Sequence, residues 1–387
     1  MSAPRIARVR AVRVAATMDA PFATPFGAVD RREAVLVEVV DTDGAVGWGE
    51  CGGPASIVEP AVADLLAPVV LGADARDCRG VWQSLWAAVQ PWGRRGAVVG
   101  ALSGCDMALW DLAARRMGCP AASLFGGILR DRFPCAAPAL NNGNGPETGR
   151  IPRMVDEAAE LFEQGYRALS VHLGRNLAHD RAVVRGLRKA MPDRAFTAHG
   201  HGAYDLPEAL AIARVLEDEG FSVFEEALSP DHPHLYTRLA AHARIPLSAG
   251  RFLQTRHDVR DLLDAGGVSI VHVDAAWCGG PTEAGRIRSL ATAEGINATP
   301  VGGITAIGFA AMMHFLASDV RQPGRVDVPP QLLRRHGGVE LLRDRIAPGC
   351  FSFEDGIARL PSGDGWGVVP DPDALRAHTV SVREVGA

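Results

Sequence analysis

Short apolar runs alternate with helical patterns along most of the chain from residue 133 onward. Between the runs, apolar residues recur at helical spacing, for example over 154–164, 207–219 and 282–294. Strands that alternate with helices form parallel βαβ units, and eight such units close a (β/α) barrel. The runs that we interpret as barrel strands, the last of them weak, are 133–140, 168–173, 195–198, 222–226, 245–249, 269–274, 297–301 and 325–328.

The first 130 residues have a different pattern, which is typical of an α+β domain. Two strand-like runs, 34–40 and 45–50, are joined by the turn sequence DTDG, which predicts a hairpin. Apolar residues at helical spacing predict a long helix over 98–118. The stretch 18–30 is rich in Pro, Gly and Ala and predicts a loop, in which Phe22 and Phe26 are exposed apolar candidates for a lid.

Composition places the chain among ordinary globular enzymes. Of its 387 residues, 47% are hydrophobic and 22% are charged, and the net charge of -5 gives no reason to expect nucleic acid or an anionic membrane as a partner. We find no signal-peptide pattern and expect no apolar run long enough to span a bilayer. Seven scattered cysteines without a CxxC motif predict reduced thiols and a cytoplasmic protein. Lys189 is the only lysine, so no other residue can act as a lysine base.

Polar side chains stand at the ends of five successive predicted strands. They are Ser170 and His172, then His199 and His201, then Glu225, then Arg251, and finally Asp274. Because the carboxyl ends of parallel barrel strands meet at one mouth, we expect these side chains to form one site. Glu226 follows Glu225 directly, and strand alternation predicts that it points away from the mouth.

At this point the chain resembles the mandelate racemase and muconate lactonizing group of the enolase superfamily, over nearly its whole length. The resemblance implies an α/β fold: a modified TIM (β/α) barrel over 131–347, an α+β capping domain over 1–130 with lid loops near 18–30 and 50–54, and a segment over 348–387 that packs back on the cap. It also implies an enolate stabilised by magnesium. The motifs that carry it are GWGEC, SGCDMALWDLAARRMGCPAASLFGG, GYRALSVHLG, FEEALSPD, IPLSAGRF, VHVDAAWCGGPTEAGRI, ATPVGGITAIGFAAMMH and LPSGDGWGV.

The chain departs from the family where the chemistry is usually done. Ser170 and His172 stand where the resemblance implies two lysines, and His199, Glu225 and Arg251 stand where it implies three acidic metal ligands. Asp274 matches the acid of a His–Asp dyad whose histidine position is Val301. We therefore expect magnesium to be disfavoured and no cofactor to be needed, because an arginine at a ligand position repels a cation.

His172 is the predicted general base, since imidazole titrates near neutral pH. For Arg251 two interpretations stay open: it replaces the charge of the metal, or it forms a closed ion pair with Glu225. Asp274 and Glu225 complete the predicted catalytic set. The predicted substrate-binding residues are Ser170, His199, His201, Trp277, Asp327, Phe22 and Phe26.

The sequence therefore predicts an isomerase or lyase that acts on a small carboxylate or polyhydroxy acid, working as a homo-oligomer. Two alternatives remain. One is a zinc or iron enzyme that uses His199, His201 and Glu225 as ligands. The other is a binding protein without catalysis on an inherited enzyme scaffold.

Overall fold

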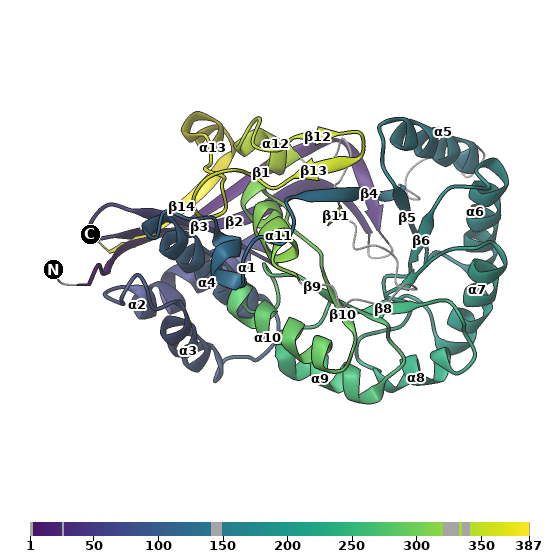
Figure 1. Ribbon diagram of the computed structural model, residues 1–387, viewed down its shortest axis with the longest axis horizontal. Helices are drawn as coiled ribbons and strands as arrows, with labels where there is room; N and C mark the ends of the chain where they lie inside the picture. Colours follow the sequence, from purple (N-terminus) through teal and green to yellow (C-terminus); the bar gives the residue numbers. More distant parts are fainter. Residues whose placement is uncertain (1–2, 25–26, 141–148, 320–332, 335–340, 387) are drawn as a thin grey trace.

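A computed structural model describes residues 3–24, 27–140, 149–319, 333–334 and 341–386. It contains an antiparallel four-stranded sheet with helices packed on it, and a larger sheet of parallel strands that curves into a barrel surrounded by helices (Figure 1). The predicted α/β fold, a barrel with an α+β capping domain, is confirmed.

The capping sheet has the strand order β14-β1-β2-β3, so it joins the two ends of the chain. Its last strand pairs antiparallel with the first, with Arg8 opposite Gly386. The elements of this domain are β1 (Ile6–Thr24), β2 (Gly27–Asp41), β3 (Val46–Cys51), α1 (Ala55–Pro60), a π-helical turn (Ala61–Leu66), α2 (Ala67–Val70), α3 (Cys78–Val89), α4 (Ala97–Arg116), a 3-10 turn (Ala121–Phe125) and, from the tail, α12 (Leu341–Ile346), α13 (Pro372–His378) and β14 (Thr379–Gly386).

The barrel strands follow one another in sequence order from β4 to β10, and each neighbouring pair is parallel. They agree with the predicted strands to within two residues at either end. The elements are β4 (Arg132–Leu140), α5 (Arg150–Glu163), β5 (Ala168–His172), α6 (Leu177–Ala190), β6 (Phe196–His199), α7 (Leu206–Asp218), β7 (Phe224–Glu225), α8 (His234–Ala240), β8 (Leu247–Ala249), α9 (Thr255–Ala265), β9 (Ile270–Val273), α10 (Gly280–Ala293), β10 (Asn297–Pro300), α11 (Ala306–Ala317) and β11 (Leu333–Arg334).

Two short strands from the tail, β12 (Phe353–Glu354) and β13 (Ile357–Arg359), extend the barrel sheet beyond β4. The predicted eighth barrel strand, 325–328, lies outside the described residues. Within them, β11 pairs parallel with β4.

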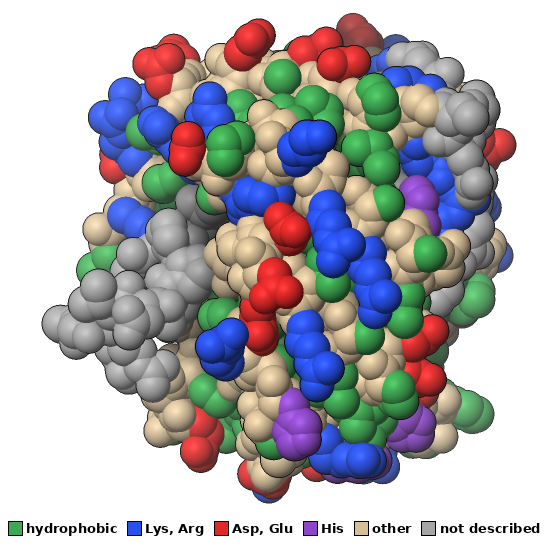
Figure 2. Space-filling view, turned by 90° about the vertical axis from the view of Figure 1, so that its right-hand side faces the viewer, with side chains coloured by type: hydrophobic (Ala, Val, Ile, Leu, Met, Phe, Trp, Pro, Cys, Tyr) green, Lys and Arg blue, Asp and Glu red, His purple; other side chains and the backbone are tan. Residues whose placement is uncertain are grey.

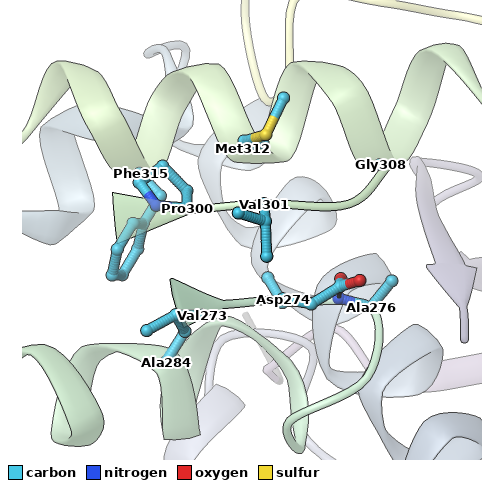
Figure 3. Close-up of a pocket in the computed structure, with 10 residues that line it drawn as sticks. Val273, Asp274, Ala276, Ala284, Pro300, Val301, Gly308, Met312 and Phe315 are labelled. Carbon is cyan, nitrogen blue, oxygen red and sulfur yellow. Dashed lines mark hydrogen bonds between the residues drawn. The ribbon is translucent and has the colours of Figure 1, made fainter. Parts of the chain in front are cut away.

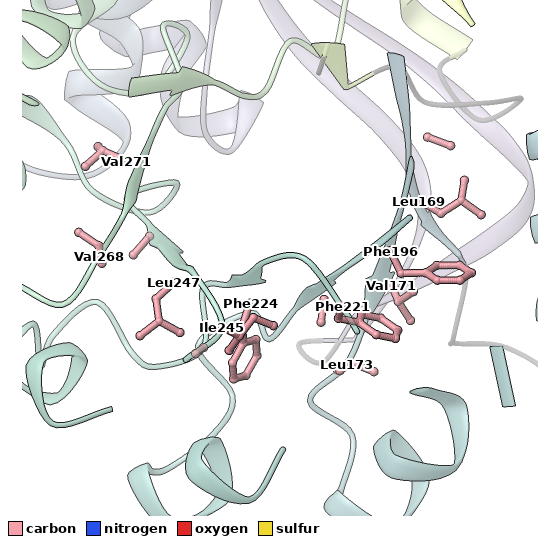
Figure 4. Packing of buried hydrophobic residues seen from close by; sticks show 14 of the residues in the cluster. Leu169, Val171, Leu173, Phe196, Phe221, Phe224, Ile245, Leu247, Val268 and Val271 are labelled. Carbon is pink, nitrogen blue, oxygen red and sulfur yellow. The ribbon is translucent and has the colours of Figure 1, made fainter. Parts of the chain in front are cut away.

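Alternating strand positions explain the barrel core. Leu169, Phe196 and Leu247 are buried and point away from the barrel axis toward the surrounding helices (Figure 4). The intervening positions carry the polar residues, which therefore face inward. The outer face over α5, α6 and α7 carries Lys and Arg side chains interspersed with Asp and Glu (Figure 2), as expected for helices that bury only one side.

Two predictions about the capping domain are wrong. The stretch 18–30 is not a loop, because β1 and β2 continue as a paired ribbon with Phe22 opposite Val29; alternating pairing with the partner strand outweighs the Pro and Gly content. Phe26 lies outside the described residues. By length and composition α4 could cross a membrane, contrary to the expectation that no run is long enough, but 89% of its apolar window is buried, as in a core helix.

The predicted long helix is present as α4, and it lies directly on β3. A Cβ atom added to Gly49 would come within 2.0 Å of the Gly104 carbonyl oxygen, and one added to Gly47 within 2.3 Å of the Ala108 carbonyl oxygen. The G-x-G spacing in GWGEC is therefore needed for the close approach of strand and helix.

We expect Gly49→Ala to lower the free energy of unfolding by about 3 kcal/mol or more, because backbone atoms cannot yield to the added methyl group. Gly285→Ala is the matched control, since its Cβ meets nothing within 4 Å. Gly285 lies in α10, where replacement by alanine should stabilise the protein by about 0.5–1 kcal/mol. Denaturant unfolding of both variants measures the difference, and equal effects would contradict the packing argument.

Candidate active site

Three of the predicted site residues stand in one row across the barrel strands. His172 at the end of β5 is in register with His199 on β6, and His199 is in register with Glu225 on β7. Residues paired in register on parallel strands face the same side of the sheet. His199 and Glu225 are buried and His172 is half-buried, so the row lines the inner wall at the barrel mouth.

The three histidines form one cluster. The ring centroids of His199 and His201 are 4.1 Å apart, and those of His172 and His201 are 4.3 Å apart. The backbone N–H of His201 donates to Nδ1 of His199 at 3.2 Å, so that nitrogen carries no proton. His201 has a φ of 55°, an uncommon conformation for a non-glycine residue that folds its ring back over the strand ends.

The electrostatics of the cluster are set by burial and by Arg251. Burial and, next, the Arg251 charge lower the pKa of His201, Glu225 opposes them, and the net pKa is about 4. His201 is therefore neutral at neutral pH. His201 therefore adds no positive charge to that of Arg251, because burial and the neighbouring guanidinium disfavour its charged form.

Asp274 stands at the end of β9, within reach of the same arginine. Burial raises the pKa of Asp274, the Arg251 charge opposes the rise, and the net pKa is about 6. Its Oδ1 accepts from the Ala276 N–H at 2.9 Å. Arg251 therefore acts electrostatically on both His201 and Asp274, which places all three at the same mouth.

A cavity lies behind Asp274, between strands β9 and β10 and helices α10 and α11 (Figure 3). Val273, Pro300, Met312 and Phe315 give it a mostly apolar lining, and Asp274 is the charged residue on its wall. It lies outside the ring of barrel strands, so it is not the predicted mouth.

The prediction that Glu226 points away from the barrel mouth is wrong. Its carboxylate accepts from the backbone N–H of Arg251 at 2.9 Å and lies 3.2 Å from Nδ1 of His272 on β9. A φ of 47° at Glu226 breaks the strand alternation on which the prediction relied. The buried pair of Glu226 and His272 was missed; a histidine in the inward register of the apolar run VHV was the signal for it.

The remaining predicted binding residues differ in how far the structure describes them. Ser170 is buried on β5, two residues before His172. The Trp277 ring packs against the loop after β3, since Cβ atoms added to Gly52 and Gly53 would each lie 3.2 Å from it. The Phe22 side chain and all of Phe26 and Asp327 lie outside what is described.

Three buried polar atoms near the row have no hydrogen-bond partner within the described part of the chain. They are Oγ of Ser170, Nε2 of His201 and Oγ of Ser248. Ser248 stands in register with Glu225 and was not predicted. A buried polar group without a partner costs about 1–3 kcal/mol, so a ligand with hydroxyl groups would relieve that cost.

The alternative zinc or iron site is not supported. Among the described residues, no group of three or more His, Cys, Asp and Glu side chains could hold a metal ion. In particular, Nδ1 of His199 faces the backbone of His201 rather than Glu225.

Comparisons with known proteins cover nearly the whole chain. Residues 6–126 match the mandelate racemase / muconate lactonizing enzyme N-terminal domain, and residues 153–374 match the enolase C-terminal domain-like family. D-galactarolactone cycloisomerase of Agrobacterium fabrum is 30% identical, over 96% of this chain and 98% of that protein. A D-galactonate dehydratase of Xanthomonas oryzae pv. oryzae is 31% identical, over 88% of this chain and 90% of that protein.

The solved structures agree with this. The 3,6-anhydro-D-galactonate cycloisomerase from Zobellia galactanivorans is 27% identical, with a TM-score of 0.85, over 98% of this chain and 100% of that one. A racemase from Streptomyces coelicolor A3(2) with bound magnesium is 26% identical, with a TM-score of 0.84, over 97% of this chain and 100% of that one.

The magnesium-bound racemase overturns the prediction that magnesium is disfavoured and that no cofactor is needed. Substitutions at three strand ends were not sufficient ground for that prediction. The described strand-end residues, however, do not themselves fit the ion, since His199, Glu225 and Arg251 offer one carboxylate where magnesium prefers octahedral oxygen coordination.

We expect Arg251→Met to raise the pKa of His201 and Glu225→Gln to lower it, because these are the charges that oppose each other there. Imidazole NMR of the purified protein measures both shifts. His314 is the control: burial lowers its pKa to about 4, and its ring is held between the Ala122 N–H and the Trp366 carbonyl. An unchanged His201 pKa in both variants would show that Arg251 does not face the cluster.

Proposed function

Since the chain belongs to the mandelate racemase / muconate lactonizing enzyme family, with its enolase-like C-terminal domain, we propose that it removes the proton beside the carboxyl group of a sugar acid or its lactone. Its relatives are cycloisomerases and dehydratases, so the protein is an isomerase or lyase acting on a polyhydroxy acid.

The observation that carries the proposal is the set of buried polar atoms without partners beside the histidine row. Ser170, His201 and Ser248 offer two hydroxyl groups and one neutral imidazole nitrogen within the barrel. A substrate with several hydroxyl groups can donate to or accept from each of them. An apolar substrate would leave all three unpaired, at a cost of about 1–3 kcal/mol each, so the site favours a polyol chain.

In this proposal His172 takes the proton. It stands where a family base stands, and imidazole is the side-chain type whose ordinary pKa suits a general base near neutral pH. The C–H electron pair moves into the carboxyl group and forms an enediolate, while the proton remains on the imidazole. His201 is neutral, so it offers a hydrogen bond and does not compete for the role of cation.

Arg251 stabilises the negative charge that develops on the substrate carboxyl group. A guanidinium is a fixed positive charge with a fork of donors that matches two carboxylate oxygens. One preorganised donor is worth roughly 3 kcal/mol in the transition state. The influence of Arg251 on both His201 and Asp274 supports this place for its charge.

Asp274 supplies the proton that completes the reaction. A carboxyl group with a pKa of about 6 is protonated in a useful fraction of molecules near neutral pH. In a dehydration, its proton leaves with the hydroxyl group beside the enediolate, and the electron pair closes a C=C bond. In a cycloisomerisation, the proton goes instead to a carbon or to the departing ring oxygen.

Turnover of D-galactarolactone, 3,6-anhydro-D-galactonate and D-galactonate, with magnesium present, tests the proposal. We expect one of them to be converted, with solvent deuterium entering at the carbon beside the carboxyl group. His172→Gln should reduce both turnover and exchange by about a hundredfold or more, while His232→Gln at an exposed position should reduce neither. Full activity of His172→Gln would remove His172 from the reaction.

The substitution Arg251→Met distinguishes between the two interpretations of Arg251, as a replacement for the metal charge or as the partner of Glu225 in a closed ion pair. If Arg251 stabilises the transition state, kcat should fall by about a hundredfold with a smaller change in KM. If it serves only in a closed pair with Glu225, turnover and binding should match those of the parent. Thermal unfolding of the variant, measured alongside, identifies any loss that comes from instability.

A further inference from the structure

A carboxylate of the capping domain reaches into the barrel close to Asp274. Glu50, on β3, is buried, and its Oε1 accepts from the Ile304 N–H at 2.8 Å. Its Oε2 accepts from the Thr305 N–H at 2.6 Å and from the Thr305 hydroxyl group. Thr305 is the N-cap of α11, so Glu50 occupies the positive end of a helix that belongs to the other domain.

The segment that Glu50 holds is pressed against Asp274. A Cβ atom added to Gly302 would lie 2.1 Å from Oδ2 of Asp274, and the φ of Gly302 is +94°. The segment 302–305 thus runs between two carboxyl groups, with Asp274 at one end and Glu50 at the other. The pKa of Glu50 is raised to about 7, mainly by burial, and the Asp274 charge adds to the rise.

A second carboxylate of the cap makes the same kind of contact elsewhere. Asp106, on α4, accepts from the Thr282 N–H at 2.7 Å and from the Thr282 hydroxyl group at 2.8 Å, in the first turn of α10. Burial raises its pKa to about 7 as well. Asp106 therefore matches Glu50 in burial, in partner chemistry and in linking the two domains, but its donors both come from Thr282 and are separate from those that Glu50 engages.

We propose that Glu50 is a positioning residue of the active site, which fixes the segment 302–305 and through it the place of the Asp274 carboxyl group at the barrel mouth. Three donors from the segment, together with the Gly308 N–H at 3.3 Å, are directed at the one carboxylate and hold the segment against Glu50. Because Gly302 is in contact with Asp274, that fixed segment forms the wall against which the carboxyl group rests. The catalytic consequence rests on the role proposed for Asp274.

Glu50→Gln tests the proposal in the full chain. Glutamine has nearly the same shape, but its amide NH2 would face N–H and O–H donors, so at least one of them loses its acceptor. Asp106→Asn is the matched control, with the same chemical change at the other contact. Both variants should lower the thermal midpoint, because both weaken the attachment of the cap.

The first readout needs no substrate. The Ala276 N–H donates to Asp274 Oδ1, so its hydrogen exchange reports on the place of that carboxyl group. We expect exchange at Ala276 and over 304–308 to accelerate about tenfold in Glu50→Gln, as for the loss of one or two hydrogen bonds. Asp106→Asn should accelerate exchange near Thr282 instead. Unchanged exchange at Ala276 in Glu50→Gln would overturn the proposal.

The second readout is kinetic, on whichever of the three sugar-acid probes the parent protein converts. Displacing an acid by a fraction of an ångström should lower kcat by about ten- to a hundredfold with little change in KM. We expect this in Glu50→Gln and not in Asp106→Asn. Equal losses in both variants would show that Glu50 only attaches the cap, and the positioning role would be wrong.

The two proposals fail in different ways. A parent protein that converts none of the probes removes the proposed function, while the exchange data still decide whether Glu50 positions Asp274. If Glu50→Gln does not fold, Glu50→Asp takes its place, since it keeps the charge but withdraws the carboxylate by one methylene group. Accelerated exchange at Ala276 in Glu50→Asp supports the proposal, and parental exchange rates overturn it.

Discussion

Two buried carboxylates, Glu50 and Asp106, determine how the capping domain sits on the barrel. A charged group removed from water is costly unless donors replace the water. Each of these carboxylates finds donors at the N-terminus of a barrel helix: Glu50 at Ile304 and at the N-cap Thr305 just before α11, and Asp106 at Thr282 in the first turn of α10. Because the donors and the acceptors belong to different domains, neither domain satisfies its own polar groups fully without the other. The barrel mouth is thus completed by a contact that is electrostatic and directional.

The mouth itself combines a rigid row of strand ends with departures from regular backbone. Register brings His172, His199 and Glu225 together, and no special local structure is needed for that. The positive φ angles at His201 and Glu226 then redirect two side chains that alternation would have placed elsewhere. Such conformations cost free energy and persist where the surrounding packing enforces them, commonly at functional sites. Here they bring an imidazole and a carboxylate toward neighbouring strands.

The sequence was most informative where one periodicity decides the outcome. Alternating apolar residues located seven barrel strands and the inward positions of Ser170 and His172, since a strand buried on one face leaves no other register. Prediction from the sequence failed where long-range pairing or a single dihedral angle decides the local structure. The pairing of Phe22 with Val29 overrides a loop-like composition, and the side-chain direction of Glu226 depends on one φ angle. The contact of Glu50 with α11 joins residues about 250 positions apart, which no local pattern can indicate.

The absence of magnesium was predicted from three strand-end residues alone, and that prediction is wrong. The magnesium-bound racemase shares the fold with this chain and is 26% identical to it. Substituted side chains show which donors a chain does not offer at those positions. They do not show what a bound substrate or another part of the chain supplies.

The pairing of β14 with β1 has a consequence for synthesis on the ribosome. The first strand of the cap leaves the ribosome long before its neighbour β14, which comprises Thr379–Gly386. At about 5–20 residues per second, the interval is on the order of tens of seconds. During that time one edge of the nascent sheet stays open while the barrel is being made. The cap thus begins the chain but is the last part to be closed, and a factor that shields exposed strand edges would act on it throughout translation.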